Sequence, residues 1–329
     1  MLSTQIFAPA LLSLVMSFAS QVANHKAELV TTFADDELPE GMAMAADGTL
    51  YVGILTTGEV KAVALDGTTT SVAFVDLDGG FMPGLSISPD GEIYVAASAP
   101  TPGSDGHGVL HVDKDTGVVS LFASFPLDTF PNHITFDAAG DMLVSESSPG
   151  SIYHVDVDTA EVSLWSDDPR LEGLPVVELG GLILGANGSV FDDGYDTLYV
   201  SNSSTSEILA IDIDEDGGAA GLTCYAGSAP DCAIDISGHV AGPDGLAFDK
   251  HGDLYIASGL NDAIVRIDKK GDVDTMWSGY PLEWPTVLIT GVTPQTKHSL
   301  FTTNIDISRL FGGTGDPLPG VVRLKVSGK

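Results

Sequence analysis

Positive charge is the scarcest property of this 329-residue chain, which has 13 lysine and arginine residues against 46 aspartate and glutamate residues. The formal net charge of −33 repels phosphate backbones and anionic lipid headgroups, so the composition excludes nucleic acid as a partner. Most of these carboxylates are expected to be solvated surface groups. Only carboxylates at special positions of a repeat would indicate a cation site.

Long hydrophobic runs are almost absent as well. The single long run, residues 4–20, is interrupted by Pro9 and is short for a membrane span, so we expect no stable span. Ser17 and Ala19 stand at the −3 and −1 positions of a possible cleavage site, although no lysine or arginine precedes the run. We therefore expect residues 1–20 to be a signal peptide and the protein to be secreted. A retained hydrophobic N-terminal tail is the alternative.

Cysteine is represented by two residues, Cys224 and Cys232, in a segment rich in glycine, alanine and serine. Neither a CxxC motif nor a pair of histidines accompanies them, which excludes a zinc site of the usual spacing. In an exported protein a local disulfide between them is expected. Two reduced thiols would be expected if the chain stayed in the cytosol.

Sustained helical periodicity is missing after residue 25, and a repeat takes its place. Each copy has a short apolar strand, a turn of the Asp-Gly type and a second strand rich in leucine, tyrosine and valine. The copies begin near Glu40, Met82, Pro131, Ala186 and Pro243, and a degenerate sixth copy runs from Pro285 to Thr303. Units of roughly 40–55 residues with three or four strands have the size of propeller blades. We therefore predict an all-β fold, a single six-bladed β-propeller over residues 25–329.

One position of the repeat, just before the first strand, carries polar side chains in most copies. It holds Glu40, Pro83, Asn132, Asn187, Asp244 and Thr286. Residues at the start of the inner strands converge at one mouth of a propeller channel, so two carboxylates and two amides would meet there. Adjacent carboxylates are unfavourable unless a cation neutralises them, and such oxygens suit Ca²⁺ better than Zn²⁺. We predict a central Ca²⁺, with Mg²⁺ or Mn²⁺ as alternatives; taken singly, each residue could instead cap its own turn.

These motifs resemble those of the SMP-30/gluconolactonase/LRE-like family, over about residues 30–325. The resemblance rests on Glu40-Gly-Met, Pro131-Asn132, Ala186-Asn187-Gly188 and Gly242-Pro243-Asp244-Gly245. It implies a six-bladed propeller with a central divalent cation and a lactonase or related esterase activity. It also implies that Glu40, Asn187 and Asp244 are metal ligands, and that Asn132 is a fourth ligand or a substrate contact.

One departure from the family bears on the substrate. Sugar-lactone hydrolases of the family carry an arginine two residues before the asparagine of the third blade, where this chain has Phe130. An apolar aromatic side chain favours a small-molecule substrate more hydrophobic than a sugar lactone. The connections that precede the inner strands should wall the mouth, so Met82, Phe130 and Trp284 are predicted to contact the substrate together with Asn132.

The catalytic prediction is metal-dependent hydrolysis of a lactone or related ester by a monomeric enzyme. Asp244 is the first candidate for the general base and His133 the second; the alternative for His133 is a hydrogen-bonded histidine within its blade. The alternative function is a non-hydrolytic propeller with a structural cation. Such a protein would be a small-molecule-binding module, or an enzyme resembling strictosidine synthase or the pericyclases.

Overall fold

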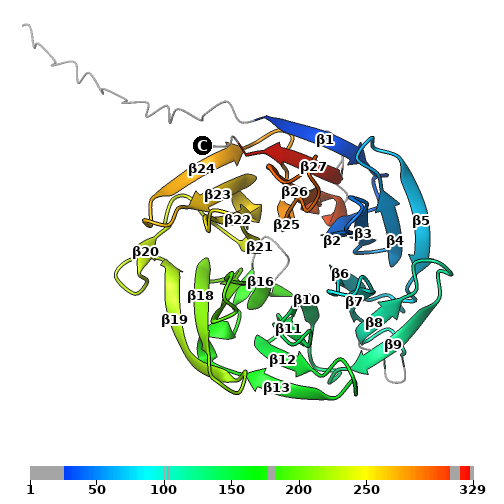
Figure 1. The fold of residues 1–329 in the computed structure, drawn as a ribbon, viewed down its shortest axis with the longest axis horizontal. Coiled ribbons are helices and arrows are strands. Elements are labelled where there is room, and N and C mark those ends of the chain that lie inside the picture. Colours follow the sequence, from blue (N-terminus) through cyan, green and yellow to red (C-terminus); the bar gives the residue numbers. More distant parts are fainter. Residues whose placement is uncertain (1–25, 100, 102–103, 177–181, 312–318, 327–329) are drawn as a thin grey trace, which may run out of the picture.

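Antiparallel strands make up nearly all of the structure, a computed structural model that describes residues 26–99, 101, 104–176, 182–311 and 319–326. Six sheets are arranged around a central axis, as predicted (Figure 1). The predicted signal peptide, residues 1–20, lies outside the described residues. No helix of the described residues is long and apolar enough to cross a membrane.

Each blade is a meander whose first strand lies nearest the axis (Figure 1). The first blade contains β2 (Pro39–Met44), β3 (Leu50–Ile54), β4 (Glu59–Val63) and β5 (Thr69–Phe74). The second contains β6 (Phe81–Ile87), β7 (Ile93–Ser98), β8 (Gly108–Val112) and β9 (Val119–Ser124), and the third β10 (Pro131–Phe136), β11 (Met142–Glu146), β12 (Ser151–Val155) and β13 (Val162–Ser166). The fourth contains β16 (Ala186–Phe191), β17 (Thr197–Asn202), β18 (Glu207–Ile213), β19 (Ala219–Gly227) and β20 (Ile234–Asp235). The fifth contains β21 (Pro243–Phe248), β22 (Leu254–Ser258), β23 (Ala263–Ile267) and β24 (Val273–Ser278).

The sixth blade closes the ring with strands from both ends of the described chain. It contains β25 (Pro285–Thr290), β26 (Ser299–Asn304) and β27 (Gly320–Lys325), and its outermost strand is β1 (Ala27–Thr32). β1 pairs antiparallel with β27, with Ala27 opposite Leu324 (Figure 1). Because β1 completes the last blade, the ring is closed by hydrogen bonds between strands from both ends of the described chain within one sheet.

The recurring Asp-Gly turns connect the two inner strands of the blades. In the third blade, one carboxylate oxygen of Asp137 accepts backbone N–H groups of Ala139, Gly140 and Asp141. Gly140 has a φ of 94°, a conformation that favours glycine. This self-contained turn fixes where the first strand ends and the second begins, which explains why the copies align on it.

The hydrophobic core lies between neighbouring blades. Val60 and Leu85 belong to one cluster shared by the first and second blades, whereas Met42 and Phe301 belong to another shared by the first and sixth. Burying each such side chain contributes about 1.5–3 kcal/mol relative to leaving it exposed. The blades are therefore packed against each other all around the ring.

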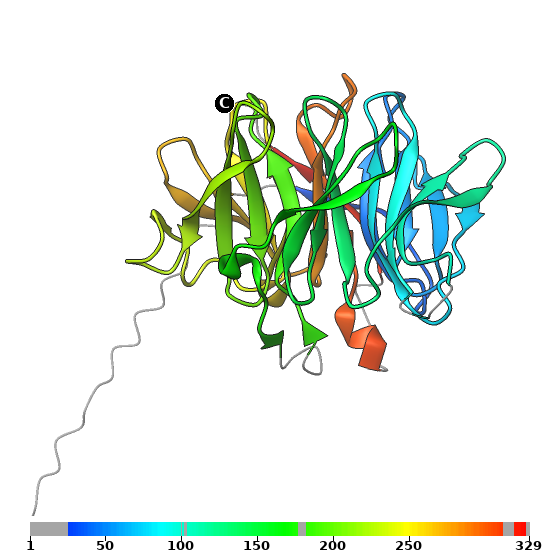
Figure 2. The ribbon, with the colours of Figure 1, turned by 90° about the horizontal axis from the view of Figure 1, so that it is seen from below.

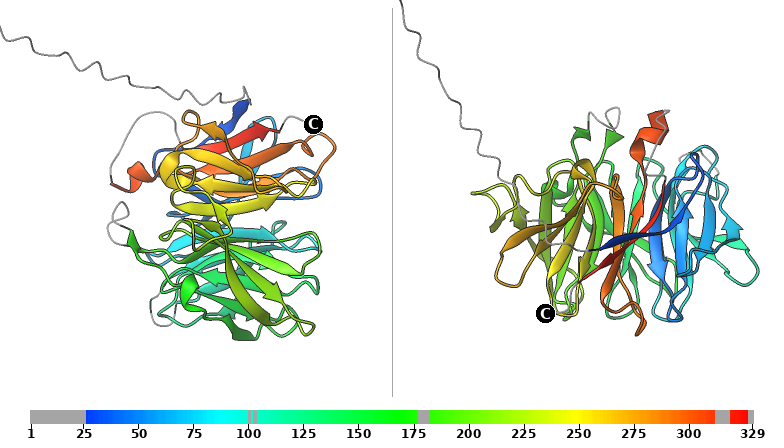
Figure 3. Two further views of the ribbon diagram at one scale, coloured as in Figure 1. Left: turned by 90° about the vertical axis from the view of Figure 1, so that its left-hand side faces the viewer. Right: turned by 90° about the horizontal axis from the view of Figure 1, so that it is seen from above.

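Three short elements extend from the face where the inner strands begin (Figures 2 and 3). They are η1 (Pro169–Leu171), the hairpin of β14 (Pro175–Val176) and β15 (Leu182–Ile183), and η4 (Ile307–Phe311); a further turn, η3 (Gly259–Asn261), lies in the fifth blade. The Asp-Gly turns lie on the opposite face. The two faces of the ring thus differ in construction, and only one carries these insertions.

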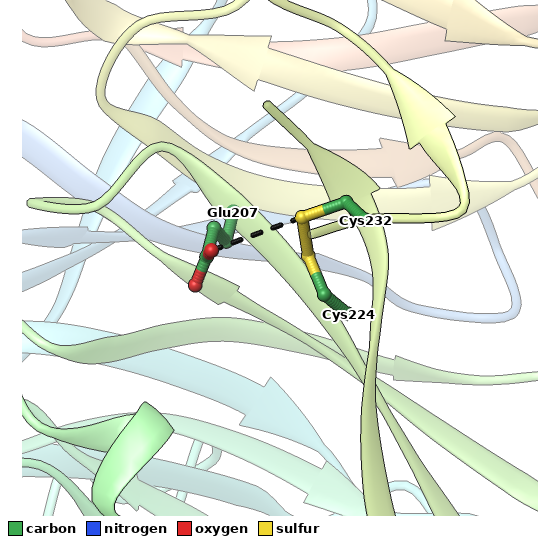
Figure 4. Close-up of side chains that lie close together, drawn as sticks. All are labelled: Glu207, Cys224 and Cys232. Atoms are coloured by element: carbon green, nitrogen blue, oxygen red, sulfur yellow. Dashed lines mark hydrogen bonds between the residues drawn. A yellow bond between two sulfur atoms is a disulfide. The ribbon is translucent and has the colours of Figure 1, made fainter. Parts of the chain in front are cut away.

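The expected disulfide is present between Cys224 and Cys232. It joins β19 to the segment that returns as β20, which pairs in parallel with β19 at Ala226 and Ile234. Glu207 lies beside the disulfide on β18 (Figure 4). Because both sulfur atoms are bonded to each other, this group of three residues has no thiolate to offer a metal.

Candidate metal site at the mouth of the channel

The six positions aligned from the sequence converge on one cavity. This cavity has a volume of about 390 Å³ and opens on the face that carries the insertions. Its lining includes all six residues: Glu40, Pro83, Asn132, Asn187, Asp244 and Thr286. The predicted convergence of two carboxylates and two amides is therefore observed.

A β-bulge in every inner strand turns these side chains toward the axis. The register shifts between Pro39 and Met42 in β2, between Pro131 and Ile134 in β10, and the other four inner strands shift at the equivalent place. A bulge bends its strand and changes the direction of a side chain. The bulge thus lets a residue at the beginning of each strand face the channel.

Glycine after the polar residue allows the inner strands to approach each other closely. A Cβ atom on Gly188 would overlap the carbonyl oxygen of Asp244, and one on Gly245 would overlap the backbone nitrogen of Leu288. The Asn187-Gly188 and Asp244-Gly245 pairs therefore bring backbones together at the same level as the polar side chains.

Serine residues orient the two amides. Nδ2 of Asn132 donates a hydrogen bond to Oγ of Ser147 at 2.9 Å, and Nδ2 of Asn187 donates to Oγ of Ser203 at 2.9 Å. With the nitrogen engaged, Oδ1 of each amide is left as the ligand atom for the cavity. Supporting hydrogen bonds of this kind fix the geometry of metal ligands.

A second set of hydroxyl groups holds the backbone of three predicted ligands from the preceding blade. Ser145 donates to the carbonyl oxygen of Asn187 at 2.6 Å, and Ser201 donates to that of Asp244 at 2.7 Å. Thr303 donates to the carbonyl oxygen of Glu40 at 2.6 Å. Each ligand position is thereby tied to its neighbouring blade.

These hydroxyl groups were missed in the sequence, although a signal was present. The second strands of the third and fourth blades share the pattern Val-Ser-x-Ser-Ser, at residues 144–148 and 200–204. The first two serines of each pattern point to the next blade, because their hydroxyl groups donate hydrogen bonds to backbone carbonyl oxygens of that blade. Comparison of the second strands, and not only of the first, would have found them.

The two carboxyl groups lie in an unfavourable environment for negative charge. Burial raises the pKa of Asp244 to about 7. Burial, with added repulsion from Asp244, raises the pKa of Glu40 well above its usual range. None of the described residues donates a hydrogen bond to either carboxylate. A divalent cation would offset the repulsion between the two carboxylates and would give their oxygen atoms a positively charged partner. Carboxylate and amide oxygens are hard ligands that fit Ca²⁺, Mg²⁺ or Mn²⁺.

The walls of the cavity are apolar. Phe81 and Phe130 lie next to each other with ring centroids 6.4 Å apart, and Trp284 lines the same cavity. The backbone N–H of Phe130 donates to the buried carboxylate of Glu146 at 2.9 Å, which fixes the loop that carries the ring. The remaining wall residues are Leu55, Leu182, Leu184, Ile305 and Ile307. Leu182 and Ile307 come from the β15 and η4 insertions, which the repeat did not predict.

Two predicted site residues lie elsewhere. Met82 is fully buried in the core between the first two blades, because Phe81 and Pro83 face the cavity and the side chain between them points the other way. His133 lines a separate cavity of about 300 Å³ formed by the inner strands beyond the bulges. Desolvation there lowers the pKa of His133 to about 4. The cavity at the mouth therefore gives no geometric support to His133 as the second candidate for the general base.

One further group of side chains has the composition of a metal site. Ligand atoms of Asp137, Asp141 and His154 lie within 4.8 Å of one another near the hairpin of the third blade. The same Asp137 oxygen is already the acceptor of the turn, and Oδ1 of Asp141 accepts the N–H of Val157 at 2.8 Å. These carboxylates serve the backbone, unlike those of the channel mouth.

Residues 168–304 match the model of the family described as SMP-30/Gluconolactonase/LRE-like region. The family resemblance is confirmed over these residues. They include Asn187 and Asp244, whereas Glu40 and Asn132 lie outside the matched region. A search of curated proteins found no match to the chain.

Solved structures with the same fold include proteins with different functions. A gluconolactonase from Xanthomonas campestris has a TM-score of 0.68 and 17% identity, over 95% of this chain and 93% of that chain. The calcium-binding protein regucalcin from Agrobacterium tumefaciens has a TM-score of 0.65 and 18% identity, over 90% and 94%. Virginiamycin B lyase from Staphylococcus aureus has a TM-score of 0.58 and 17% identity, over 85% and 82%. At these identities the likeness establishes the fold alone.

Proposed function

We propose that the protein is a metal-dependent hydrolase of a lactone or related ester. The observation that carries this proposal is the channel mouth, where Glu40, Asn132, Asn187 and Asp244 direct oxygen atoms into a cavity with apolar walls. The family match over residues 168–304 and the similarity to a gluconolactonase and to the calcium-binding protein regucalcin support it. Ca²⁺ is the first candidate ion, with Mg²⁺ and Mn²⁺ as alternatives.

Glu40, Asn187 and Asp244 would hold the cation, with Asn132 as a fourth ligand or as a contact to the substrate. When bound, the cation would polarise the ester carbonyl and stabilise the negative charge that develops on its oxygen. Asp244 would accept a proton from the attacking water as the water oxygen bonds to the carbonyl carbon. The ring C–O bond then breaks, the leaving oxygen receives the proton, and a hydroxy acid is released.

The substrate is proposed to be more hydrophobic than a sugar lactone. Phe81, Phe130 and Trp284 present rings to the cavity, and burying apolar surface against them contributes about 25 cal/mol per Å². No described residue lining the cavity carries a positive charge. Long-chain or aromatic lactones should therefore be better substrates than gluconolactone.

The decisive variant is Asp244→Asn, which keeps the shape of the side chain and removes its basicity. Hydrolysis of an aromatic lactone should fall by about 100-fold or more, because positioned general bases contribute factors of about 10²–10⁴. The unfolding temperature in EDTA should not fall, and Glu161→Gln, at an exposed site, should keep full activity. Full activity of Asp244→Asn would refute this mechanism.

A non-hydrolytic propeller is the second candidate. It is favoured by one observation: among the described residues that line the mouth cavity, Glu40 and Asp244 are the only ionisable groups, and none is a serine, cysteine or histidine. A panel of lactones and aryl esters separates the classes. Activity that disappears with EDTA and returns with Ca²⁺ supports the hydrolase, and silence across the panel supports a binding protein or a lyase-type or cyclase-type enzyme.

We also propose that the protein acts outside the cell as a monomer. The Cys224–Cys232 disulfide supports export, since such bonds persist in oxidising compartments. Mass determination of the mature protein after expression with its own N-terminus tests the cleavage after Ala19, and sedimentation tests the oligomeric state.

A further inference from the structure

A further cavity of about 410 Å³ lies on the face opposite the channel mouth. It is a groove between the fifth and sixth blades. It is formed by the β21–β22, β23–β24 and β25–β26 turns, the start of β26 and Val326, which follows β27. Figure 3 shows the hairpin turns of these blades on one side of the ring and η4 on the other. Nothing proposed above for the channel mouth makes use of this groove.

Positive charge is concentrated in this groove, which we call the basic groove. Of the 13 lysine and arginine residues in the chain, five line it. They are Lys250, Arg266, Lys269, Lys270 and Lys297. Two histidines, His251 and His298, line it as well. The net charge of the chain is −33, so a surface with more basic than acidic side chains is the opposite of its average composition.

The acidic residues of the groove are already engaged. One carboxylate oxygen of Asp249 accepts the N–H groups of His251 and Asp253, and one of Asp268 accepts those of Lys270 and Asp272. Asp253, the third acid, is 3.7 Å from Arg266, which also pairs with Asp274 at 2.5 Å.

The four lysines of the groove form no ion pair with any residue that the structure describes. Their ammonium groups are therefore available to a ligand.

The positive groups also lie close enough to affect one another. The side chain of Lys269 crosses to the neighbouring turn, where its Nζ would be 3.0 Å from a Cβ atom placed on Gly252. The charge of Lys250 is the largest cause that lowers the pKa of His298, followed by desolvation and by the charges of Lys297 and His251. Charges from three separate turns thus converge on one volume.

We propose that the basic groove binds a small organic anion that carries two or more acidic groups. Lys250, Lys269 and Lys297 would each meet one acidic group, because they project from different turns around the same space. Val326, which is partly exposed above the buried Tyr255 and Leu300, would contact the carbon skeleton of the ligand. The volume lies within the range of sites for organic molecules and is far larger than a single inorganic anion needs.

The test uses naphthalene trisulfonate as the probe, because sulfonates carry charge without chelating Ca²⁺. Isothermal titration at fixed ionic strength should show one site per chain, with an affinity at least about tenfold higher than for naphthalene monosulfonate. Lys250→Gln and Lys269→Gln should each weaken binding about three- to tenfold, the effect of one lost charge-assisted contact. Lys114→Gln, which removes a lysine of the second blade, should leave the affinity unchanged.

Histidine titration by NMR gives an independent readout on the same protein. Bound trisulfonate should raise the pKa of His298, because an anion offsets the repulsion from Lys250, Lys297 and His251 that lowers it. His154, in the third blade, should not respond. The proposal would be overturned by equal affinity for the two sulfonates, or by a loss of affinity in Lys114→Gln as large as in the groove variants. It would also be overturned by a pKa of His298 that does not change on binding. Binding of the trisulfonate should persist in EDTA, because the groove needs no metal ion. A failure of the anion-binding proposal can therefore be told apart from a failure of the hydrolase proposal.

Discussion

Two clusters of acidic residues, one at the channel mouth and one at a hairpin turn, differ in what their oxygen atoms contact. Asp137 and Asp141 of the third-blade turn accept several backbone N–H groups, so their charge is compensated locally. The side-chain carboxylates of Glu40 and Asp244 receive no hydrogen bond from the described residues, and burial raises the pKa of both. We therefore infer a cation site from carboxylates that lack hydrogen-bond donors, and not from the number of carboxylates in a cluster.

A third acidic pair, Glu283 and Asp306, lies next to the mouth and is compensated in another way. Arg309 contacts Asp306, and hydrogen bonding links Glu283 with Asp306. Here the guanidinium of Arg309 and a shared proton offset the negative charge, which is the role that we assign to a metal cation between Glu40 and Asp244. The three clusters therefore represent three solutions to the same electrostatic problem.

The largest effect outside the ligands themselves is expected from Ser203→Ala. Loss of the hydroxyl leaves Nδ2 of Asn187 without its acceptor, so the amide is no longer held with Oδ1 toward the cavity. Removal of such a supporting contact commonly reduces metal affinity or activity about 10–100-fold. Ser120→Ala, on the exposed side of β9, is the matched control. An unchanged affinity for Ca²⁺ in Ser203→Ala would show that the serine does not orient the ligand.

A smaller effect is expected from Phe130→Arg, which changes the wall and leaves the ligands intact. The guanidinium would offer hydrogen bonds to hydroxyl groups and remove an aromatic surface next to Phe81. The ratio of kcat/KM for gluconolactone to that for an aromatic lactone should rise about tenfold or more. The pocket hypothesis fails if the wild-type protein already prefers sugar lactones, or if the ratio does not change.

The smallest effect is expected from Glu283→Gln and concerns stability. Burial, with the neighbouring Asp306, raises the pKa of Glu283 from 4.5 to about 7. The folded state therefore binds this proton more tightly than the unfolded state, and Glu283 lowers stability as the pH rises from about 4.5 to about 7. The variant should lose less stability than the wild type between pH 5 and pH 8 in urea unfolding, with Ca²⁺ binding preserved. A parallel pH dependence of the two proteins would contradict this.

The fold and the six convergent positions could be predicted because the Asp-Gly turns fix the alignment of the copies. Once the copies are aligned, Glu40 and Asp244 occupy the same place, although they are far apart in sequence. Met82 and His133 were misplaced because each stands next to a residue that faces the mouth, and alternation along the strand turns the neighbouring side chain the other way.

The insertions were also beyond sequence reasoning. Leu182 and Ile307 belong to segments outside the repeat, so no other copy indicates their position. The basic groove required the structure for a different reason, since its charges come from turns that are separated along the chain and meet only where two blades adjoin.

The central claim is that the mouth binds a cation through Glu40 and Asp244, and titration of the EDTA-treated protein with Ca²⁺ tests it most directly. We expect one ion per chain, an affinity reduced about 100-fold or more in Glu40→Gln and Asp244→Asn, and no reduction in Asp141→Asn. Tight binding that survives both mouth variants, or that is lost in Asp141→Asn, would contradict the account.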